Sequence, residues 1–208
     1  MIAGTGSGCG KTMVTLAVLR AMQRRNIPLA AFKCGPDYID PMFHKAVLGI
    51  PSRNLDLFFI SEREVRGQIV RSIPQNGIGV IEGVMGFYDG VSGTTDTASA
   101  AHLARETGTP AILVVRPKGQ SLSLAAMLSG FRNFAENTLC GVILNGISDT
   151  MYPFYCDIVQ KSGLKVLGYL PSVPEAEIPD RHLGLVTADE LKDLNYRLDL
   201  LADAAENR

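Results

Sequence analysis

Short apolar segments alternate along this chain with longer segments in which apolar residues recur every three or four positions. This alternation predicts strand–helix units, in which the short runs form a parallel sheet that helices cover on both faces. The predicted strands are Leu29–Lys33, Ile78–Glu82, Ala111–Val115, Leu139–Leu144, Lys165–Leu170 and a short first one at Met1–Ala3. The predicted helices are Lys11–Arg25, Glu62–Ser72, Thr97–Thr107, Leu122–Phe134, Tyr152–Ser162 and an acidic last one near Ala188–Ala205. We therefore expect a doubly wound α/β fold with a mainly parallel sheet, in which ligands bind beyond the carboxyl ends of the strands.

The composition favours a single domain whose partners are small molecules or proteins. The 208 residues suit one hydrophobic core, and 46% apolar with 20% charged residues is ordinary for a globular protein. A formal net charge of -1 without any long basic run argues against binding to nucleic acid or to a membrane surface. Apolar runs also stay shorter than the roughly 18 residues that a membrane span requires.

The cysteines and the N-terminus indicate a cytoplasmic protein. The four cysteines lie far apart, with no pair at the spacing of a metal site or a redox motif, so reduced thiols are expected. Met1 leads into a Gly-rich loop without a basic leader sequence. Because the first predicted strand is short, we expect that the natural protein begins several residues earlier or that the chain is trimmed.

The clearest chemical signal is the Gly-rich segment Gly4–Thr12, which reads GTGSGCGKT between the first predicted strand and a helix. Its glycines let backbone N–H groups surround phosphate oxygens at the start of the helix. Lys11 is predicted to reach the β- and γ-phosphates of ATP, and the Thr12 hydroxyl to ligate Mg²⁺. The loop is one residue longer than the standard pattern, because Gly4 precedes Lys11 by seven positions. The residues expected to contact the nucleotide are Gly6, Ser7, Gly8, Cys9, Gly10, Lys11 and Thr12.

Two further segments that follow predicted strands carry carboxylates. Glu82 ends a buried strand at the phosphate edge of the sheet, where Mg²⁺ requires oxygen ligands, and Asp89 follows to meet metal or substrate. The alternative for both is a solvated acid beside a loop. Asp37 and Asp40 lie between two prolines and can converge on one cation or orient a nucleophile, although an ordinary turn is the alternative. We predict an active-site loop here, in which His44 caps or packs locally.

The later strands end near a candidate base-binding residue. Asn145 follows the apolar run VIL, and its side chain offers both the donor and the acceptor that the edges of adenine require. A turn or helix-entry role for Asn145 is an equal alternative from its spacing.

Five motifs, in order, resemble the N-terminal synthetase domain of the cobyrinic acid a,c-diamide synthase family. They are GTGSGCGKT, FKCGPDYID, SRNLD at Ser52–Asp56, VIEGVMGFYDG and RHLGL at Arg181–Leu185, and the resemblance runs over essentially the whole chain. It implies a P-loop domain over residues 1–208 that folds like dethiobiotin synthetase. It also implies ATP- and Mg²⁺-dependent amidation of the a and c acetate carboxylates of cobyrinic or hydrogenobyrinic acid, in cobalamin biosynthesis.

The resemblance also implies roles for single residues. Lys11 and Thr12 would handle phosphates and metal, while Glu82 with one of Asp37 or Asp40 would complete the metal shell. The positions that match motif residues used in catalysis or substrate handling are Asp37, Tyr38, Ile39, Glu82 and Asp89, and those of the adenine pocket are Asn145 and Pro171. The chemistry is consistent, because a carboxylate must become an acyl phosphate before ammonia can attack it, and phosphoryl transfer mainly requires positioning and charge neutralisation.

One departure from the family concerns its C-terminal glutaminase domain, which releases ammonia from glutamine. This chain ends at Arg208 without a Gly-x-Cys-x-Gly elbow. We expect a synthetase fragment that uses free ammonium but not glutamine, with a corrinoid as substrate and the glutaminase domain as a partner in the full-length protein. The sequence does not give the oligomeric state, and a homodimer is compatible with it.

Two other hypotheses compete with the assignment to the diamide synthase family. A ParA/MinD-like ATPase switch shares the fold and an expanded loop, but carries a signature lysine where this chain has Gly6, and the acidic last helix lacks a basic membrane-binding face. A sister ligase is the other alternative, either dethiobiotin synthetase or the enzyme that diamidates nickel sirohydrochlorin. The GPDYID and EGVMGFYDG loops favour a diamide synthase over the biotin enzyme, but they do not separate the tetrapyrrole substrates.

Overall fold

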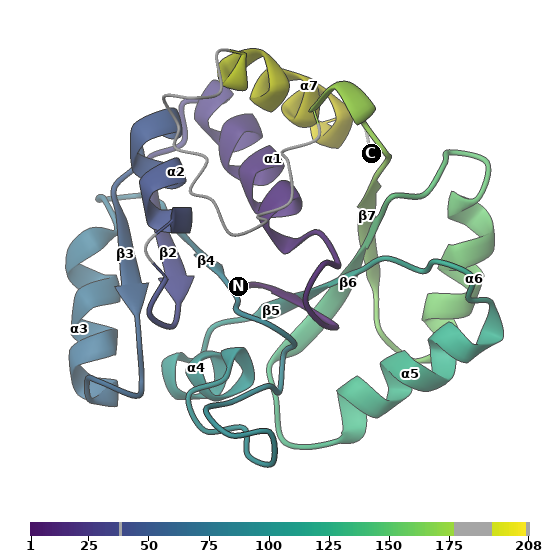
Figure 1. Cartoon of the computed structure of the whole chain (residues 1–208), viewed down its shortest axis with the longest axis horizontal. Coiled ribbons are helices and arrows are strands. Elements are labelled where there is room, and N and C mark those ends of the chain that lie inside the picture. The colour runs from purple at the N-terminus through teal and green to yellow at the C-terminus, as the bar shows by residue number, and fades with distance from the viewer. Residues whose placement is uncertain (38, 177–192, 207–208) are drawn as a thin grey trace.

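The computed structural model describes residues 1–37, 39–176 and 193–206, and its centre is a seven-stranded sheet (Figure 1). The strands lie in the order β3-β2-β4-β1-β5-β6-β7, and each is parallel to its neighbours. Their bounds are β1 Ile2–Gly4, β2 Leu29–Cys34, β3 Ser52–Leu55, β4 Ile78–Glu82, β5 Ala111–Val115, β6 Leu139–Asn145 and β7 Val166–Leu170. The predicted parallel α/β architecture is thereby confirmed.

Among the described residues, six α-helices connect these strands, and a short 3-10 helix and a seventh α-helix follow the last strand. Their bounds are α1 Lys11–Arg24, α2 Ile39–Leu48, α3 Glu62–Ser72, α4 Ala100–Thr107, α5 Leu122–Asn133, α6 Tyr152–Lys161, η1 Pro174–Ala176 and α7 Leu194–Glu206. No helix among the described residues is both long and apolar enough to cross a membrane.

Two hydrophobic cores, one on each face of the sheet, make the fold doubly wound. Along β2, Leu29 and Ala31 point into the core beneath α1, α2 and α7, while Ala30 and Phe32 point into the core beneath α3 to α6. The two helix groups lie on opposite sides of the sheet in Figure 1. Because both faces of the central strands are buried, their sequences are continuously apolar, which is why these strands were predictable.

The short strand β1 lies in the middle of the sheet, between β4 and β5. Ile2 is in register with Glu82 on one side and with Ile112 on the other. The segment after β4 stays beside β1, since the Phe87 N–H donates to the Gly4 carbonyl over 2.8 Å. The end of β1 therefore brings the Gly-rich loop into contact with the loop that follows Glu82.

The region between β2 and α3 differs from the prediction. The predicted loop around Asp40 and His44 is instead the helix α2. Pro41 does not prevent this helix, because it falls in the first turn, where a missing N–H costs no helical hydrogen bond. The strand β3 was not predicted, because this edge strand reads SRNL and buries only Leu55. An edge strand with polar side chains lacks the apolar run by which a buried strand is recognised.

Smaller differences concern where helices begin. The helix predicted from Thr97 begins at Ala100, because the Ser99 hydroxyl accepts a hydrogen bond from the His102 N–H and caps the helix. The last helix begins at Leu194, and the part predicted to precede it, from Ala188, falls largely outside the described residues. The motif at residues 181–185 also lies outside them.

Candidate functional site

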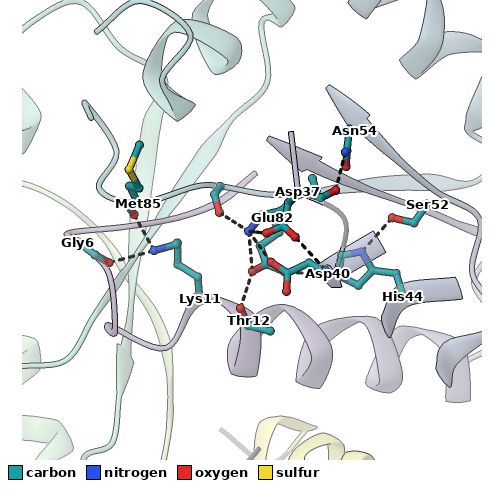
Figure 2. A network of polar contacts seen from close by, with 12 residues as sticks. Gly6, Lys11, Thr12, Asp37, Asp40, His44, Ser52, Asn54, Glu82 and Met85 are labelled. Carbon is teal, nitrogen blue, oxygen red and sulfur yellow. Dashed lines mark hydrogen bonds and ion pairs between the residues drawn. The ribbon is translucent and has the colours of Figure 1, made fainter. Parts of the chain in front are cut away.

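The Gly-rich loop connects β1 to α1 and holds the buried side chain of Lys11 at its centre. Gly8 and Gly10 adopt φ angles of 73° and 98°, which residues other than glycine rarely adopt. The Lys11 ammonium donates to the Gly6 carbonyl over 3.0 Å and to the Met85 carbonyl over 2.6 Å (Figure 2). Burial lowers the pKa of Lys11. The loop thus presents a lysine at the start of a helix, as a phosphate-binding site requires.

Thr12, the next residue, joins this loop to the carboxylate at the end of β4. Its hydroxyl donates to Glu82 Oε1 over 2.6 Å. Glu82 is completely buried, at 0% exposure. The two predicted metal ligands therefore lie side by side, because β1 and β4 are neighbours and both end at the same edge of the sheet.

Lys33 lies at the centre of the acidic residues, a position that the sequence analysis missed. Its ammonium is 2.7 Å from Asp40 Oδ2, 3.1 Å from Glu82 Oε1 and 3.9 Å from Asp37 Oδ2. Burial lowers the pKa of Lys33, but the nearby carboxylates of Glu82 and Asp40 outweigh that effect and raise it. A positive charge therefore holds the carboxylates together. The signal that could have found it is a lysine inside an otherwise apolar strand.

His44 is the second residue whose position was not predicted. Its Nδ1 and the hydroxyl of Ser52, on the neighbouring strand β3, are 3.0 Å apart. Its Nε2, however, lies 3.4 Å from Glu82 Oε2, and both side chains are buried. We call Lys33, Asp40, His44 and Glu82 the buried charged cluster.

The remaining predicted residues lie around this cluster. Asp37 is half-buried beside it, and its Oδ1 accepts a hydrogen bond from the Asp40 N–H. Asp89 is exposed, and its carboxylate accepts a hydrogen bond from the Gly86 N–H, so its observed contact lies within its own loop. Tyr38 lies outside the described residues.

Asn145 lies against the Gly-rich loop at Cys9 and Gly10. Its side-chain amide donates to the Cys9 carbonyl over 3.0 Å, and a β-carbon added to Gly10 would lie 1.9 Å from the same nitrogen. Pro171 follows Leu170, which is in register with Asn145. Both predicted adenine-pocket residues are thus at the sheet edge that carries the phosphate loop.

The oxygen atoms of this site fit a divalent cation. Thr12, Glu82 and Asp40 offer hydroxyl and carboxylate ligands, the types that Mg²⁺ prefers. Glu82 Oε2 is buried without a hydrogen-bond partner among the described residues, and a cation is one means of satisfying such an atom.

A second group of potential ligands lies on the surface, between α3 and α4. It consists of Glu62, His102 and Glu106, whose ligand atoms are within 4.8 Å of one another. Arg66 approaches both glutamates, at 3.7 and 3.1 Å, and so supplies a counter-charge. His102 Nδ1 accepts a hydrogen bond from the Ala98 N–H, which in the neutral ring leaves the proton on Nε2. This group is an exposed ion-pair network rather than a candidate metal centre.

Comparison with curated proteins finds relatives that share the name cobyrinate a,c-diamide synthase. The chain is 43% identical to the one from Clostridium acetobutylicum over 212 residues, covering 100% of this chain and 48% of the relative. It is 44% identical to that of Salmonella typhimurium over 193 residues, covering 91% of this chain and 42% of the relative. The chain thus spans about half the length of these relatives.

Solved structures share the fold at low sequence identity. MinD cell division protein of Aquifex aeolicus matches with a TM-score of 0.57 and 15% identity, covering 100% of this chain and 97% of that chain. A ParA family ATPase of Chlorobium tepidum matches with a TM-score of 0.55 and 15% identity, covering 99% and 90%. The family model described as the CobQ/CobB/MinD/ParA nucleotide binding domain matches residues 1–186. With its phosphate loop and its parallel sheet, the chain belongs to the CobQ/CobB/MinD/ParA nucleotide-binding domain family.

Proposed function

We propose that this chain is the ATP-dependent amidoligase domain of a cobyrinate a,c-diamide synthase. It would amidate the a and c acetate carboxylates of cobyrinic or hydrogenobyrinic acid in cobalamin biosynthesis. The observation that carries the proposal is the contact between the phosphate loop and the buried charged cluster through Thr12 and Glu82. The names of the curated relatives support the choice of substrate.

The chemistry begins with binding of ATP at the Gly-rich loop. Lys11 exchanges the carbonyls of Gly6 and Met85 for phosphate oxygens and neutralises charge as the γ-phosphoryl group is transferred. Thr12, Glu82 and Asp40 would hold Mg²⁺, which when bound neutralises charge on the phosphates. This division of roles accounts for a hydroxyl and two carboxylates within reach of the loop.

The substrate carboxylate attacks the γ-phosphorus, so that ADP leaves and an acyl phosphate forms. Ammonia then attacks the acyl carbon, and inorganic phosphate leaves as the amide forms. Asp37 and Asp89 are the candidates that orient ammonia or the substrate, and Asp37 is the nearer to the buried charged cluster. Tyr38, beside Asp37 in sequence, is a further candidate for substrate handling.

The nucleotide base would bind beyond the ends of β6 and β7. Asn145 and Pro171 lie at this edge, and we assign the adenine pocket to them. Gly6 to Gly10 supply backbone N–H groups to the phosphates.

Ammonia would come from glutamine in the full-length protein, through a glutaminase domain that lies outside the present chain. The relatives are about twice as long as the part that this chain matches, which is compatible with such a further domain. The described cysteines are unpaired, which agrees with a cytoplasmic enzyme.

The test is to incubate the chain with Mg-ATP, an ammonium salt and one tetrapyrrole at a time, measuring phosphate release and product mass. We expect cobyrinic or hydrogenobyrinic acid to stimulate phosphate release and to gain amides, whereas glutamine does not replace ammonium. Stimulation by nickel sirohydrochlorin alone would assign the sister enzyme. Turnover that responds to DNA or to a protein partner, without any tetrapyrrole, would contradict the ligase and favour an ATPase switch.

A further inference from the structure

The helix α2 directs two side chains of one face toward the same ion pair. Lys33 and Glu82 are cross-strand partners of β2 and β4. Asp40 and His44 are one helical turn apart on α2, so they lie on the same side of the helix. Asp40 contacts the lysine, at 2.7 Å, whereas His44 approaches the glutamate, at 3.4 Å. Each member of the strand pair thus has its own neighbour on the helix, and Figure 2 shows Asp40 and His44 beside Glu82.

The imidazole of His44 is fixed from its other side by β3. Ser52, which begins this strand, is in register with Ala31 of β2 and places its hydroxyl 3.0 Å from Nδ1. When the serine donates to Nδ1, the proton of the neutral ring lies on Nε2, which faces Glu82. The ring can therefore present a donor beside the carboxylate.

The two oxygens of Glu82 have different surroundings. Oε1 accepts from Thr12 and from Lys33, at 2.6 and 3.1 Å. Oε2 and His44 Nε2 are both buried and lie 3.4 Å apart, and neither has a hydrogen-bond partner among the described residues. The histidine is thus the polar group placed beside Oε2, while Thr12 and Lys33 hold Oε1.

We propose that His44, held by Ser52, is a positioning residue that orients Glu82 for the divalent cation of the phosphate site. This inference rests on the proposed function for the presence of that cation. Groups behind a metal ligand orient it, and their loss typically costs about 10- to 100-fold in metal affinity or activity. His44 has no part in the phosphoryl transfer itself.

Mn²⁺ binding, measured by electron paramagnetic resonance in the presence of a non-hydrolysable ATP analogue, provides the test. His44→Phe fills the space without a donor, and we expect about 10-fold weaker Mn²⁺ binding. His44→Gln places an amide near the position of Nε2 and should restore binding to within about 3-fold, since a donor is again available. Binding of the analogue without metal should be unchanged in both variants.

Two further variants complete the design. Ser52→Ala frees the ring with little loss of volume and should weaken Mn²⁺ binding by about 3-fold; it carries the test if circular dichroism shows that His44→Phe is unfolded. His102→Gln is the matched control, because that histidine also neighbours two glutamates but lies on the surface, and its Mn²⁺ binding should equal that of the parent chain.

The outcomes separate this inference from the proposed function. Unchanged Mn²⁺ binding in folded His44→Phe, or in Ser52→Ala if that variant alone folds, overturns the role of His44 and leaves the ligase proposal standing. A glutamine variant as weak as the phenylalanine variant also overturns it, because shape rather than hydrogen bonding would then be decisive. A parent chain that binds no Mn²⁺ with the nucleotide analogue overturns both proposals.

Discussion

The two ends of helix α1 carry charged side chains in opposite surroundings. At its start, Lys11 is buried, and the neighbouring Thr12 donates to Glu82 of the buried charged cluster, which has 0% exposure. Toward its end, Arg20 and Arg24 pair with Asp199 of α7 at 2.7 and 2.9 Å, on the surface. The same helix therefore takes part in one ionic network that water reaches and in another that water does not.

This difference separates charges kept for chemistry from charges that join two elements. Desolvation makes a buried ion pair no more stabilising than well-packed apolar residues, yet removing one partner leaves the other uncompensated. An exposed pair contributes little and is screened by salt. A buried network of this kind is therefore better explained by the site it builds than by the stability it provides.

The largest expected effect comes from removing the cation of the buried network. In Lys33→Met, Asp40 and Glu82 lose their shared counter-charge, so the free energy of unfolding should fall by about 3–5 kcal/mol at neutral pH. Urea denaturation measures it. Lys45→Met on the exposed side of α2 is the control, with an expected change below about 0.5 kcal/mol. Equal effects of the two variants would show that loss of the buried lysine costs no more than loss of an exposed one.

The next effect concerns the phosphate end of α1. Lys11→Ala removes the group that neutralises the transferring phosphoryl charge, so tetrapyrrole-stimulated phosphate release should fall by about 10²- to 10³-fold. Time-course assays of phosphate release measure this rate, and circular dichroism checks that the fold is retained. A loss below about 10-fold would show that Lys11 does not contact the transferred group.

The smallest effect belongs to the surface network. Asp199→Asn should lower the free energy of unfolding by about 0.2–1 kcal/mol at neutral pH and low salt, because this half-exposed pair is screened by solvent. The side-chain hydrogen bond from Arg20 lowers the pKa of Asp199 below its ordinary 3.8. The stabilisation is thus present above pH 3.8 and is lost as the pH falls through the lowered pKa.

Urea denaturation of the parent chain and of Asp199→Asn, over a range of pH and salt concentration, measures the difference in the free energy of unfolding. Asp157→Asn, on the exposed face of α6, should leave stability unchanged and serves as the control. A loss for Asp199→Asn that persists in about 1 M salt would mean that the surface network resembles the buried one.

The sequence predicted the part of the site that depends on strand order and missed the part that depends on register and on α2. Thr12 and Glu82 could be placed together because each follows a buried apolar strand, and such strands end at one edge. Lys33 could not, because its role arises from its cross-strand register with Glu82. The approach of His44 to Glu82 was not foreseen, because two prolines and an acidic segment resemble a loop, whereas Pro41 is accommodated in the first turn of a helix.

The central position of β1 also determines when the nucleotide site can form during synthesis. β1 precedes both of its sheet neighbours in the chain, since β4 and β5 end at Glu82 and Val115. Pairings between such distant segments close late, because they require long stretches of intervening chain. A nascent chain that has already exposed its Gly-rich loop on the ribosome should therefore bind no nucleotide until Val115 has emerged.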